Sequence, residues 1–292
     1  MTENTITKRK VISSLIWKFL ERGGVQGVQF ILSVILARLV SPSDYGIIAL
    51  LLVFIQIANV FIQTGFSTAL VQKKDSDDID FSSVFFMSLF VATILYIILF
   101  FSAPFVAKFY NYSNLIILLR VLSITLFFGA INSIQNAYVS KTMRFKCLFL
   151  SNIIAVSISG IIGIIFAYND FGIWALVFQQ LSNVFLSCVV LWFSVKWRPK
   201  FVFSFTRLKC LFSFGWKLLC SSLLDVIFKN IYNLVIGKTY STEQLGIFDR
   251  GQQFPKVIAT NLDGSIQGVM FPTLSAYNDD VSTVKKNMSK SN

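Results

Sequence analysis

Long uninterrupted apolar runs constrain this chain more than any other feature. The run from Leu89 to Phe101 has no charged residue. A helix that crosses the hydrocarbon core of a bilayer needs about 20 mostly apolar residues, whereas strands of a membrane barrel alternate apolar and polar side chains. With 55% hydrophobic and 14% charged residues, the sequence predicts an all-α, polytopic membrane protein and excludes a barrel.

Eight membrane helices are predicted, at residues 15–39, 44–70, 81–107, 113–138, 147–168, 171–195, 208–236 and 247–275. The first apolar run is too long for a signal-peptide core and lacks a small-residue cleavage site, so we expect it to remain as a helix.

Lys and Arg residues are distributed unequally between the two sides of these helices. One side holds 16 of them, the other only Arg38, Lys108 and Lys238. Since basic residues collect in cytoplasmic loops, we expect both chain ends to lie in the cytoplasm, with short outer connections.

An internal repeat is the most informative feature. The pair Trp17-Lys18 recurs as Trp216-Lys217, and the segment from Ala37 to Ile47 recurs, loosely, from Gly237 to Ile247 at an offset of 200 residues. A unit of six helices would repeat in parallel, as in transporters whose site lies between two halves. We therefore predict an N-terminal six-helix lobe at 1–204 and the first two helices of a truncated C-terminal lobe at 205–292.

Polar residues form stripes along three predicted helices. In the first helix, Lys18, Arg22, Gln26 and Gln29 lie three or four residues apart on one face. The two cations either extend to the lipid headgroups or begin a polar path. Charges within a span are costly and indicate function.

The last two predicted helices carry the other stripes. Asp225 precedes Lys229 by four residues, so the two could neutralise one another or line a cavity. The final predicted helix carries a straight polar face, which predicts a water-filled cavity or another polar helix as its neighbour; the face consists of Asp249, Gln253, Lys256, Thr260, Asp263 and Gln267.

Several kinds of chemistry are excluded or disfavoured. The chain has no histidine, which removes the usual near-neutral proton shuttle, and it has no phosphate-binding loop or zinc signature. We predict no enzyme activity, cofactor, metal site or nucleic-acid partner. The acidic cluster Asp75 to Asp80 could hold a metal in a glycosyltransferase, but we interpret it as a solvated, mobile loop.

Six long segments resemble one family of bacterial membrane proteins. They are WKFLERGGVQGVQFILSVILARLVSPSDYGIIAL from Trp17, GFSTALVQKKD from Gly65, FGIWALVFQQL from Phe171, VKWRPKFVFSF from Val195, FSFGWKLLCSSLLDVIFKNIYNLVIGK from Phe212 and LGIFDRGQQFP from Leu245. Together they resemble polysaccharide and O-antigen flippases of the Wzx/teichuronic-acid exporter type, within the multidrug/oligosaccharidyl-lipid/polysaccharide exporter superfamily.

This resemblance implies a function. Such flippases are expected to move undecaprenyl-diphosphate-linked oligosaccharides across the bacterial inner membrane by alternating access, for lipopolysaccharide or other surface polysaccharide, alongside a polysaccharide polymerase and chain-length machinery. Cationic cavity residues would bind the pyrophosphate or acidic sugars. Here the candidates are Arg22, Arg120, Lys217, Lys229, Arg250 and Lys256; Asp225, Asp249 and Asp263 would pair or couple to ions, and Gln26, Gln29, Gln253 and Gln267 would complete the polar surface.

Alternatives remain open. The resemblance implies a family whose members usually have 12 to 14 helices, whereas eight are predicted here. The chain could therefore be an inactive truncated product or an assembly partner. An ion-coupled small-molecule antiporter of the same superfamily is a further alternative. A membrane-embedded polymerase or glycosyltransferase is disfavoured, because no long catalytic loop separates the predicted helices.

Overall fold

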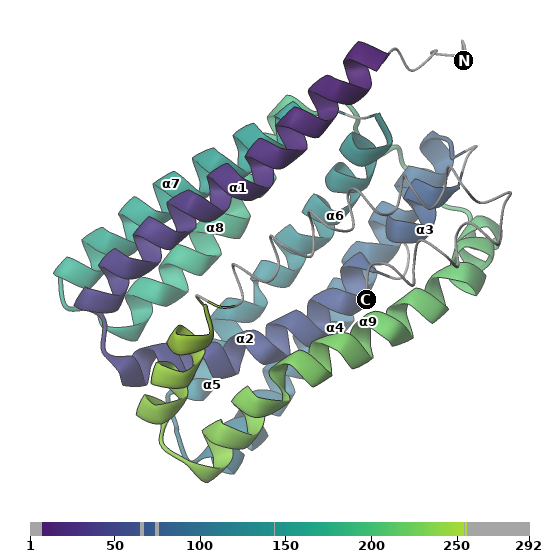
Figure 1. The fold of residues 1–292 in the computed structure, drawn as a ribbon. Coiled ribbons are helices and arrows are strands. Elements are labelled where there is room, and N and C mark those ends of the chain that lie inside the picture. Colours follow the sequence, from purple (N-terminus) through teal and green to yellow (C-terminus); the bar gives the residue numbers. More distant parts are fainter. Residues whose placement is uncertain (1–7, 65–66, 74–75, 143, 254, 256–292) are drawn as a thin grey trace, which may run out of the picture. The chain divides into compact units, whose positions relative to one another are not determined.

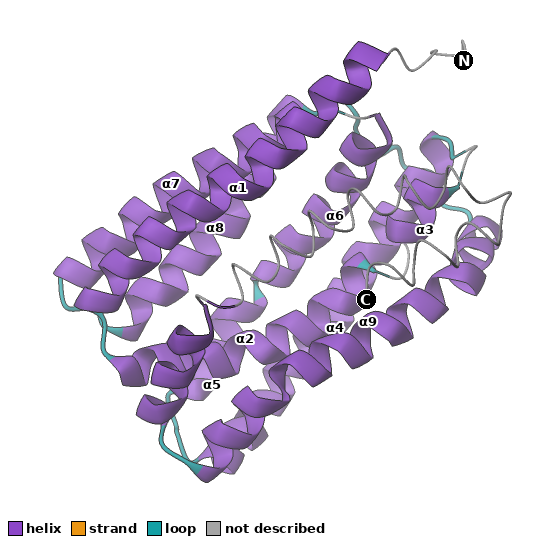
Figure 2. Cartoon of the chain, viewed as in Figure 1, coloured by secondary structure: helices purple, strands orange, loops and turns teal. Residues whose placement is uncertain are grey.

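The computed structural model describes residues 8–64, 67–73, 76–142, 144–253 and 255. The chain divides into two units, Met1–Asp249 and Arg250–Asn292, and the architecture below is that of the first. Its described residues form helices joined by short connections, without a strand (Figure 2). The predicted all-α membrane fold is confirmed.

Nine helices have defined bounds in the described chain. They are α1 (Lys8–Leu39), α2 (Pro42–Gln63), α3 (Ser67–Gln72), α4 (Asp78–Tyr110), α5 (Leu115–Ser123), α6 (Thr125–Thr142), α7 (Phe145–Tyr168), α8 (Ile173–Ser194) and α9 (Phe205–Thr239). A further helical segment begins at residue 242.

Six helical stretches are long and apolar enough to cross a membrane, and the apolar part of α1, Gly23–Leu39, is shorter. These stretches cover the predicted helices from the second to the seventh. The eighth begins within the described chain and continues into residues that the structure does not describe.

Two predicted helices are interrupted. The helix predicted at 44–70 ends as α2 at Gln63, and the one predicted at 113–138 is divided into α5 and α6 around Ile124. At the second break, the hydroxyls of Ser123 and Thr125 donate to the carbonyls of Leu119 and Leu122. Such side-chain bonds to the backbone compete with regular helix geometry.

The helices of the first unit form two groups (Figure 1). Helices α1, α7 and α8 lie side by side, while α2 packs with α5, α6 and α9, and α4 packs with α5, α6 and α9. Close approach of α1 to α7 depends on Gly160, where a β-carbon would overlap the side chain of Leu32. Contacts of α8 with α6 and α2 join the two groups.

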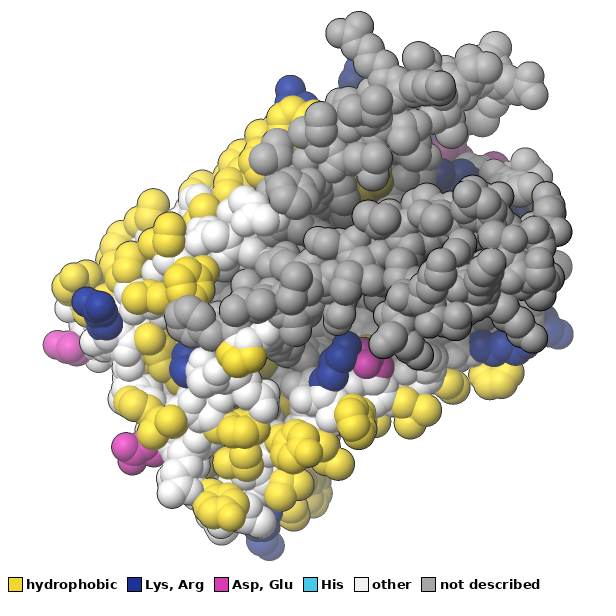
Figure 3. All heavy atoms as spheres, viewed as in Figure 1, with side chains coloured by type: hydrophobic (Ala, Val, Ile, Leu, Met, Phe, Trp, Pro, Cys, Tyr) yellow, Lys and Arg dark blue, Asp and Glu magenta, His cyan; other side chains and the backbone are white. Residues whose placement is uncertain are grey.

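Apolar side chains also cover much of the outside. Figure 3 shows hydrophobic side chains along the sides of the described surface. Three aromatic side chains on these helices, Phe105, Phe193 and Phe228, are 75–80% exposed. Exposed aromatic side chains on helices of membrane-spanning length are expected to contact lipid acyl chains.

The connection between α8 and α9 is bound to the start of α4. The backbone N–H groups of Lys200 and Ser204 donate to the hydroxyls of Ser82 and Ser83, each over 3.0 Å. Trp197 is buried in an apolar cluster of α3, α4, α6 and α8 residues. This connection is therefore part of the packed structure.

An ionic cluster strengthens the same junction. The carboxylate of Asp80 is fully buried and accepts from Lys73 at 2.6 Å and Arg207 at 3.4 Å. Arg207 also donates to both oxygens of Asp77 at 2.6 Å, which lowers the pKa of Asp77 from 3.8 to about 2. The interpretation of this segment as a solvated loop is wrong for Asp80, because buried carboxylates require charged or hydrogen-bonding partners.

At the opposite end of α9, two equivalent turns cross. A β-carbon on Gly46 would overlap the carbonyl oxygen of Thr242, and one on Gly246 would overlap that of Pro42. The hydroxyls of Ser43 and Thr242 are hydrogen-bonded at 2.7 Å. Glycines at such crossings allow two backbones to approach closely.

The two turns also share a capping pattern. The hydroxyl of Ser41 accepts from the backbone N–H of Asp44, and that of Ser241 accepts from Gln244, each at 3.2 Å. This local equivalence has the 200-residue offset seen in the sequence. The division into lobes at residues 204 and 205 remains a prediction.

Candidate functional site: a carboxamide-lined cavity

A cavity of about 350 Å³ lies among α1, α2, α6, α7 and α8. It is a partly open space between the two groups of helices described above. Along α6 its lining extends from Thr125 to Asn136, which at 1.5 Å per residue is about 16 Å, or roughly half the thickness of a bilayer core.

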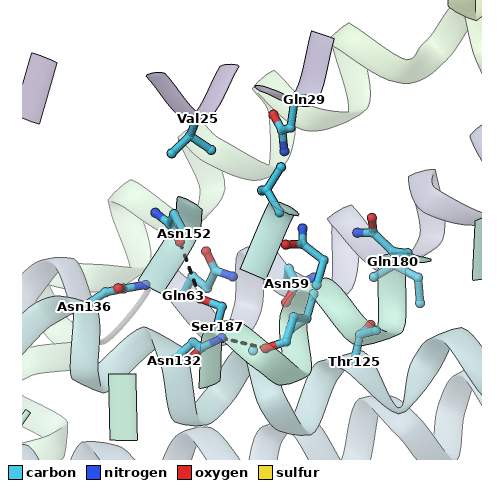
Figure 4. A pocket seen from close by; sticks show the side chains of 15 residues that line it. Val25, Gln29, Asn59, Gln63, Thr125, Asn132, Asn136, Asn152, Gln180 and Ser187 are labelled. Atoms are coloured by element: carbon cyan, nitrogen blue, oxygen red, sulfur yellow. Dashed lines mark hydrogen bonds between the residues drawn. The ribbon is translucent and has the colours of Figure 1, made fainter. Parts of the chain in front are cut away.

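Carboxamide side chains dominate the lining. Eight of the 15 lining residues are Asn or Gln, and none of the 15 carries a charge. In Figure 4, Gln29 comes from α1, opposite the carboxamides of α2 and α6. The eight are Gln29, Asn59, Gln63, Asn132, Asn136, Asn152, Gln180 and Asn183.

Some of these groups are fixed by hydrogen bonds to α8. The amide nitrogen of Asn132 donates to the carbonyl of Val184 at 3.3 Å. The hydroxyl of Ser187 donates to the amide oxygen of Asn152 at 3.4 Å (Figure 4). These bonds orient the carboxamides, so that Asn132 directs its oxygen away from Val184.

Two amide oxygens at the cavity are buried without a hydrogen-bond partner within the described chain. They are Oδ1 of Asn59 and Oδ1 of Asn132. An unpaired buried acceptor costs about 1–3 kcal/mol, so native proteins usually satisfy such atoms with water or a ligand. The cavity wall thus contains two acceptors whose hydrogen-bonding capacity is unused within the described chain.

Small residues shape the space around these oxygens. A β-carbon on Gly129 would lie 2.9 Å from Oδ1 of Asn59, closer than normal contact. Glycine at this position therefore allows the Asn59 carboxamide to occupy its place between α2 and α6.

Among the residues predicted for the site, Gln29 lines this cavity. Gln26 lies on α1 and is partly buried. The backbone of Arg22 belongs to α1, but its side chain lies outside the described part. The polar face predicted on α1 therefore remains a prediction.

Arg120 lies elsewhere, at the packing of α5 against α4. Its guanidinium is 3.9 Å from the ring centroid of Phe100, and its Nε donates to the Phe100 carbonyl at 3.4 Å. Arg120 does not belong to the lining of the described cavity. Its proposed contact with substrate remains a prediction.

The predicted residues of α9 also lie away from the cavity. Lys229 donates to Asp225 at 2.7 Å within the helix, and both side chains are more than half exposed. Lys217 is exposed on the same helix. The ion pair corresponds to mutual neutralisation within the helix, which is one of the two interpretations that the sequence allowed.

The final predicted stripe is only partly described. Asp249 ends the first unit, and Arg250 donates to the amide oxygen of Gln253 at 2.8 Å in the second. Lys256, Asp263 and Gln267 lie outside the described residues. The cationic cavity predicted between two lobes therefore remains a prediction.

Sequence reasoning missed seven of the eight cavity carboxamides because it searched for charges. A helical spacing of uncharged polar residues was nevertheless present. Asn59 and Gln63 are four residues apart, as are Asn132 and Asn136, each pair within an apolar helix. Side chains four apart share one helix face, which would have indicated a polar interior surface.

Sequence comparisons find relatives involved in polysaccharide synthesis. The chain is 24% identical over 276 residues to the succinoglycan biosynthesis transport protein ExoT of Rhizobium meliloti, covering 94% of this chain and 56% of that protein. It is 27% identical over 239 residues to the teichuronic acid biosynthesis protein TuaB of Bacillus subtilis, covering 80% and 49% respectively. The chain spans about half the length of these curated relatives.

A solved structure shares the fold. It is described as the inward-facing conformation of a multidrug resistance MATE family transporter of the MOP superfamily, with a TM-score of 0.54 and 16% identity. The match covers 76% of this chain and 56% of that one. At this identity the likeness concerns the helical arrangement alone.

A family model described as polysaccharide biosynthesis protein matches residues 35–292. This match includes the cavity helices α2, α6, α7 and α8, but only the last five residues of α1, so Val25 and Gln29 lie outside it. The resemblance noted in the sequence is confirmed at this level, and the chain belongs to the polysaccharide biosynthesis protein family.

Proposed function

We propose that this chain acts in the export of cell-surface polysaccharide, by flipping undecaprenyl-diphosphate-linked oligosaccharide units across the bacterial inner membrane. The observation that carries the proposal is a cavity lined by carboxamides and placed among helices of membrane-spanning length. The chain that contains it belongs to a polysaccharide biosynthesis family. A flippase must give sugars a polar path while its helices remain in lipid.

The mechanism follows from the same requirement. Sugars and pyrophosphate would enter a polar interior, while the polyprenyl chain stays in the bilayer. Alternating access would open that interior first to the cytoplasm and then to the outside. The pyrophosphate requires cations, for which Arg22, Lys217 and Lys256 are candidates.

The ends of the helices support the proposed orientation. Lys73, Lys141 and Arg207 lie at the junction of α3, α4, α6 and α9, where the sequence predicts the cytoplasmic side. Lys238 lies over the Phe109 ring at the other end. Both chain ends would then be cytoplasmic by the positive-inside tendency, and a polysaccharide polymerase would receive the flipped units.

Deletion of the gene in its own host tests the proposal. We expect surface polysaccharide to disappear and lipid-linked oligosaccharide to accumulate, with its sugars inaccessible to an impermeant glycan-modifying reagent in intact cells. A plasmid copy of the same gene should restore both. The control is a strain lacking the glycosyltransferase that begins the repeat unit, which should lose the polysaccharide without accumulating the lipid.

Unchanged surface polysaccharide in the deletion strain would overturn the proposal. So would accumulated lipid-linked sugars that the reagent modifies in intact cells, because they would already have crossed the membrane.

A further inference from the structure

We propose that the carboxamide-lined cavity of the first unit is a binding site for an uncharged sugar ring. This inference rests on the proposed function and deepens it, because it assigns the sugar and not the pyrophosphate to this part of the chain. It depends on four properties of the cavity: its charge, its hydrogen-bonding groups, its unpaired acceptors and its size.

The absence of charge among the lining residues decides which ligands fit. A pyrophosphate or an acidic sugar in a membrane interior needs Arg or Lys partners, and sites for Ca²⁺ or Mg²⁺ are usually built with carboxylates. The 15 lining residues of the described chain provide neither. A neutral ligand is the one that such a cavity can hold without an uncompensated charge.

The hydrogen-bonding groups match sugar hydroxyls. Each carboxamide has an acceptor oxygen and a two-proton donor, and each sugar hydroxyl is likewise both donor and acceptor. Eight carboxamides together with the hydroxyls of Thr125 and Ser187 surround the space. A hydrocarbon chain would leave these groups unpaired, so a polyprenyl tail is a poor occupant.

Two unpaired acceptors border the cavity, and a rotation of their carboxamides would present them to hydroxyl donors. Oδ1 of Asn59 and Oδ1 of Asn132 are buried and unpartnered within the described chain. The bond from Asn132 to the carbonyl of Val184 uses the amide nitrogen, which leaves the oxygen as the available atom. A ligand that donates to both oxygens would satisfy them at once.

The volume of the cavity matches a ligand of about one sugar ring. A space of about 350 Å³ is at the lower end of the range of roughly 300–1,000 Å³ for small-molecule sites. It accommodates one ring rather than a complete repeat unit. The site would therefore hold one sugar residue of a longer glycan.

Saturation-transfer NMR on the purified full chain tests this assignment. The detergent should be lauryldimethylamine oxide, since glucoside and maltoside headgroups would compete for the site. The probes are methyl β-D-glucopyranoside, methyl β-D-galactopyranoside and methyl β-D-glucuronide. We expect signals from at least one neutral glycoside, and a signal at least about fivefold weaker from the anionic glucuronide.

Three variants locate the binding. Asn132→Leu removes an unpaired acceptor and Gly129→Ala displaces the Asn59 carboxamide without removing a polar group; each should reduce the neutral-glycoside signal at least about fivefold. The control is Gln135→Leu, because Gln135 is a buried carboxamide on the same helix that does not line the cavity. This variant should keep the signal.

Several results would overturn the inference. One is the absence of a signal from both neutral glycosides with wild-type protein, which would leave the cavity occupied by water alone. Another is an equal loss in Gln135→Leu and Asn132→Leu, and a third is a glucuronide signal as strong as the neutral ones. Thermal unfolding of each variant shows whether a lost signal reflects a lost fold. If Asn132→Leu does not fold, the signal of Gly129→Ala decides whether the cavity binds the glycoside, because this variant retains every carboxamide.

The outcome is separable from that of the proposed function. If gene deletion blocks export but neutral glycosides do not bind, the flippase proposal stands and the sugar site falls. If glycosides bind but deletion leaves export intact, the reverse holds.

Discussion

Gly46 and Gly246 pack against each other where α2 crosses the helical segment that follows α9. Each glycine lies where a β-carbon would overlap the carbonyl oxygen of the residue four positions earlier in the other segment. The two positions are 200 residues apart, so equivalent residues of the two copies meet at this crossing. Neither helix can accept a side chain there without moving the other backbone.

Gly46→Ala should therefore destabilise the chain. We expect a loss of about 1–3 kcal/mol, because overlap with backbone cannot be relieved by a rotamer change. Thermal unfolding of the purified protein in detergent measures it. The matched control is Gly27→Ala, where a β-carbon would meet nothing within 4 Å; equal unfolding temperatures for the two variants would contradict the described crossing.

Asp80→Asn should release the connection between α8 and α9. The fully buried carboxylate of Asp80 binds Lys73 and Arg207, and its loss should cost about 1–2 kcal/mol of local opening energy. Trypsin can cleave this connection after Lys196, but not after Arg198, because Pro199 follows Arg198. Cleavage after Lys196 should therefore accelerate about tenfold.

Asp78→Asn is the matched control for that experiment. Asp78 pairs with Lys200, but both side chains are at least half exposed, and such pairs contribute about 0–1 kcal/mol. Its cleavage rate should stay close to that of the wild type. Equal acceleration in both variants would show that burial of Asp80 is not what holds the connection.

The pair of Asp77 and Arg207 predicts a specific pH dependence. Because Arg207 lowers the pKa of Asp77 from 3.8 to about 2, its stabilising effect is complete above pH 3.8 and is lost as the pH falls towards 2. The difference in unfolding temperature between wild type and Asp77→Asn should thus be constant from pH 8 to pH 5. A difference that shrinks over this range would contradict the assignment.

Lys229 and Asp225 can be tested by exchanging their charges. If the pair serves only to neutralise itself within α9, Asp225→Lys combined with Lys229→Asp should restore export that either single neutralisation reduces. If Lys229 binds an anionic substrate group, Lys229→Gln should reduce export and the exchange should not restore it. Both side chains are more than half exposed, so breaking the pair should cost only about 0–1 kcal/mol of stability. We therefore expect the second result.

The sequence predicted the helical framework well because apolar runs directly reflect bilayer thickness. It could not predict the break at Ile124, since Ser123 and Thr125 are compatible with a helix until their hydroxyls bond to the backbone. It predicted a solvated acidic loop because nothing local distinguishes Asp80 from its neighbours. Burial of Asp80 depends on Arg207, more than 120 residues away.

The cavity was harder to predict than the helices. Of the residues proposed from the sequence, Gln29 belongs to it, because a polar face on one helix is visible in the sequence alone. The convergence of Asn59, Asn132 and Gln180 from three other helices is a property of packing. Carboxamides within apolar helices are also less conspicuous than charges, although burying either requires partners.

The two ends of α9 are held by different kinds of contact. One end is fixed by ion pairs that salt can weaken. Just beyond the other end, the turn after Thr239 is fixed by an uncharged glycine crossing that salt does not affect. A helix of 35 residues is about 52 Å long, so a tilt of about 10° around the glycine end would displace the ionic end by about 9 Å. Raising the salt concentration should therefore loosen the Arg207 end of α9 and leave the glycine crossing unchanged.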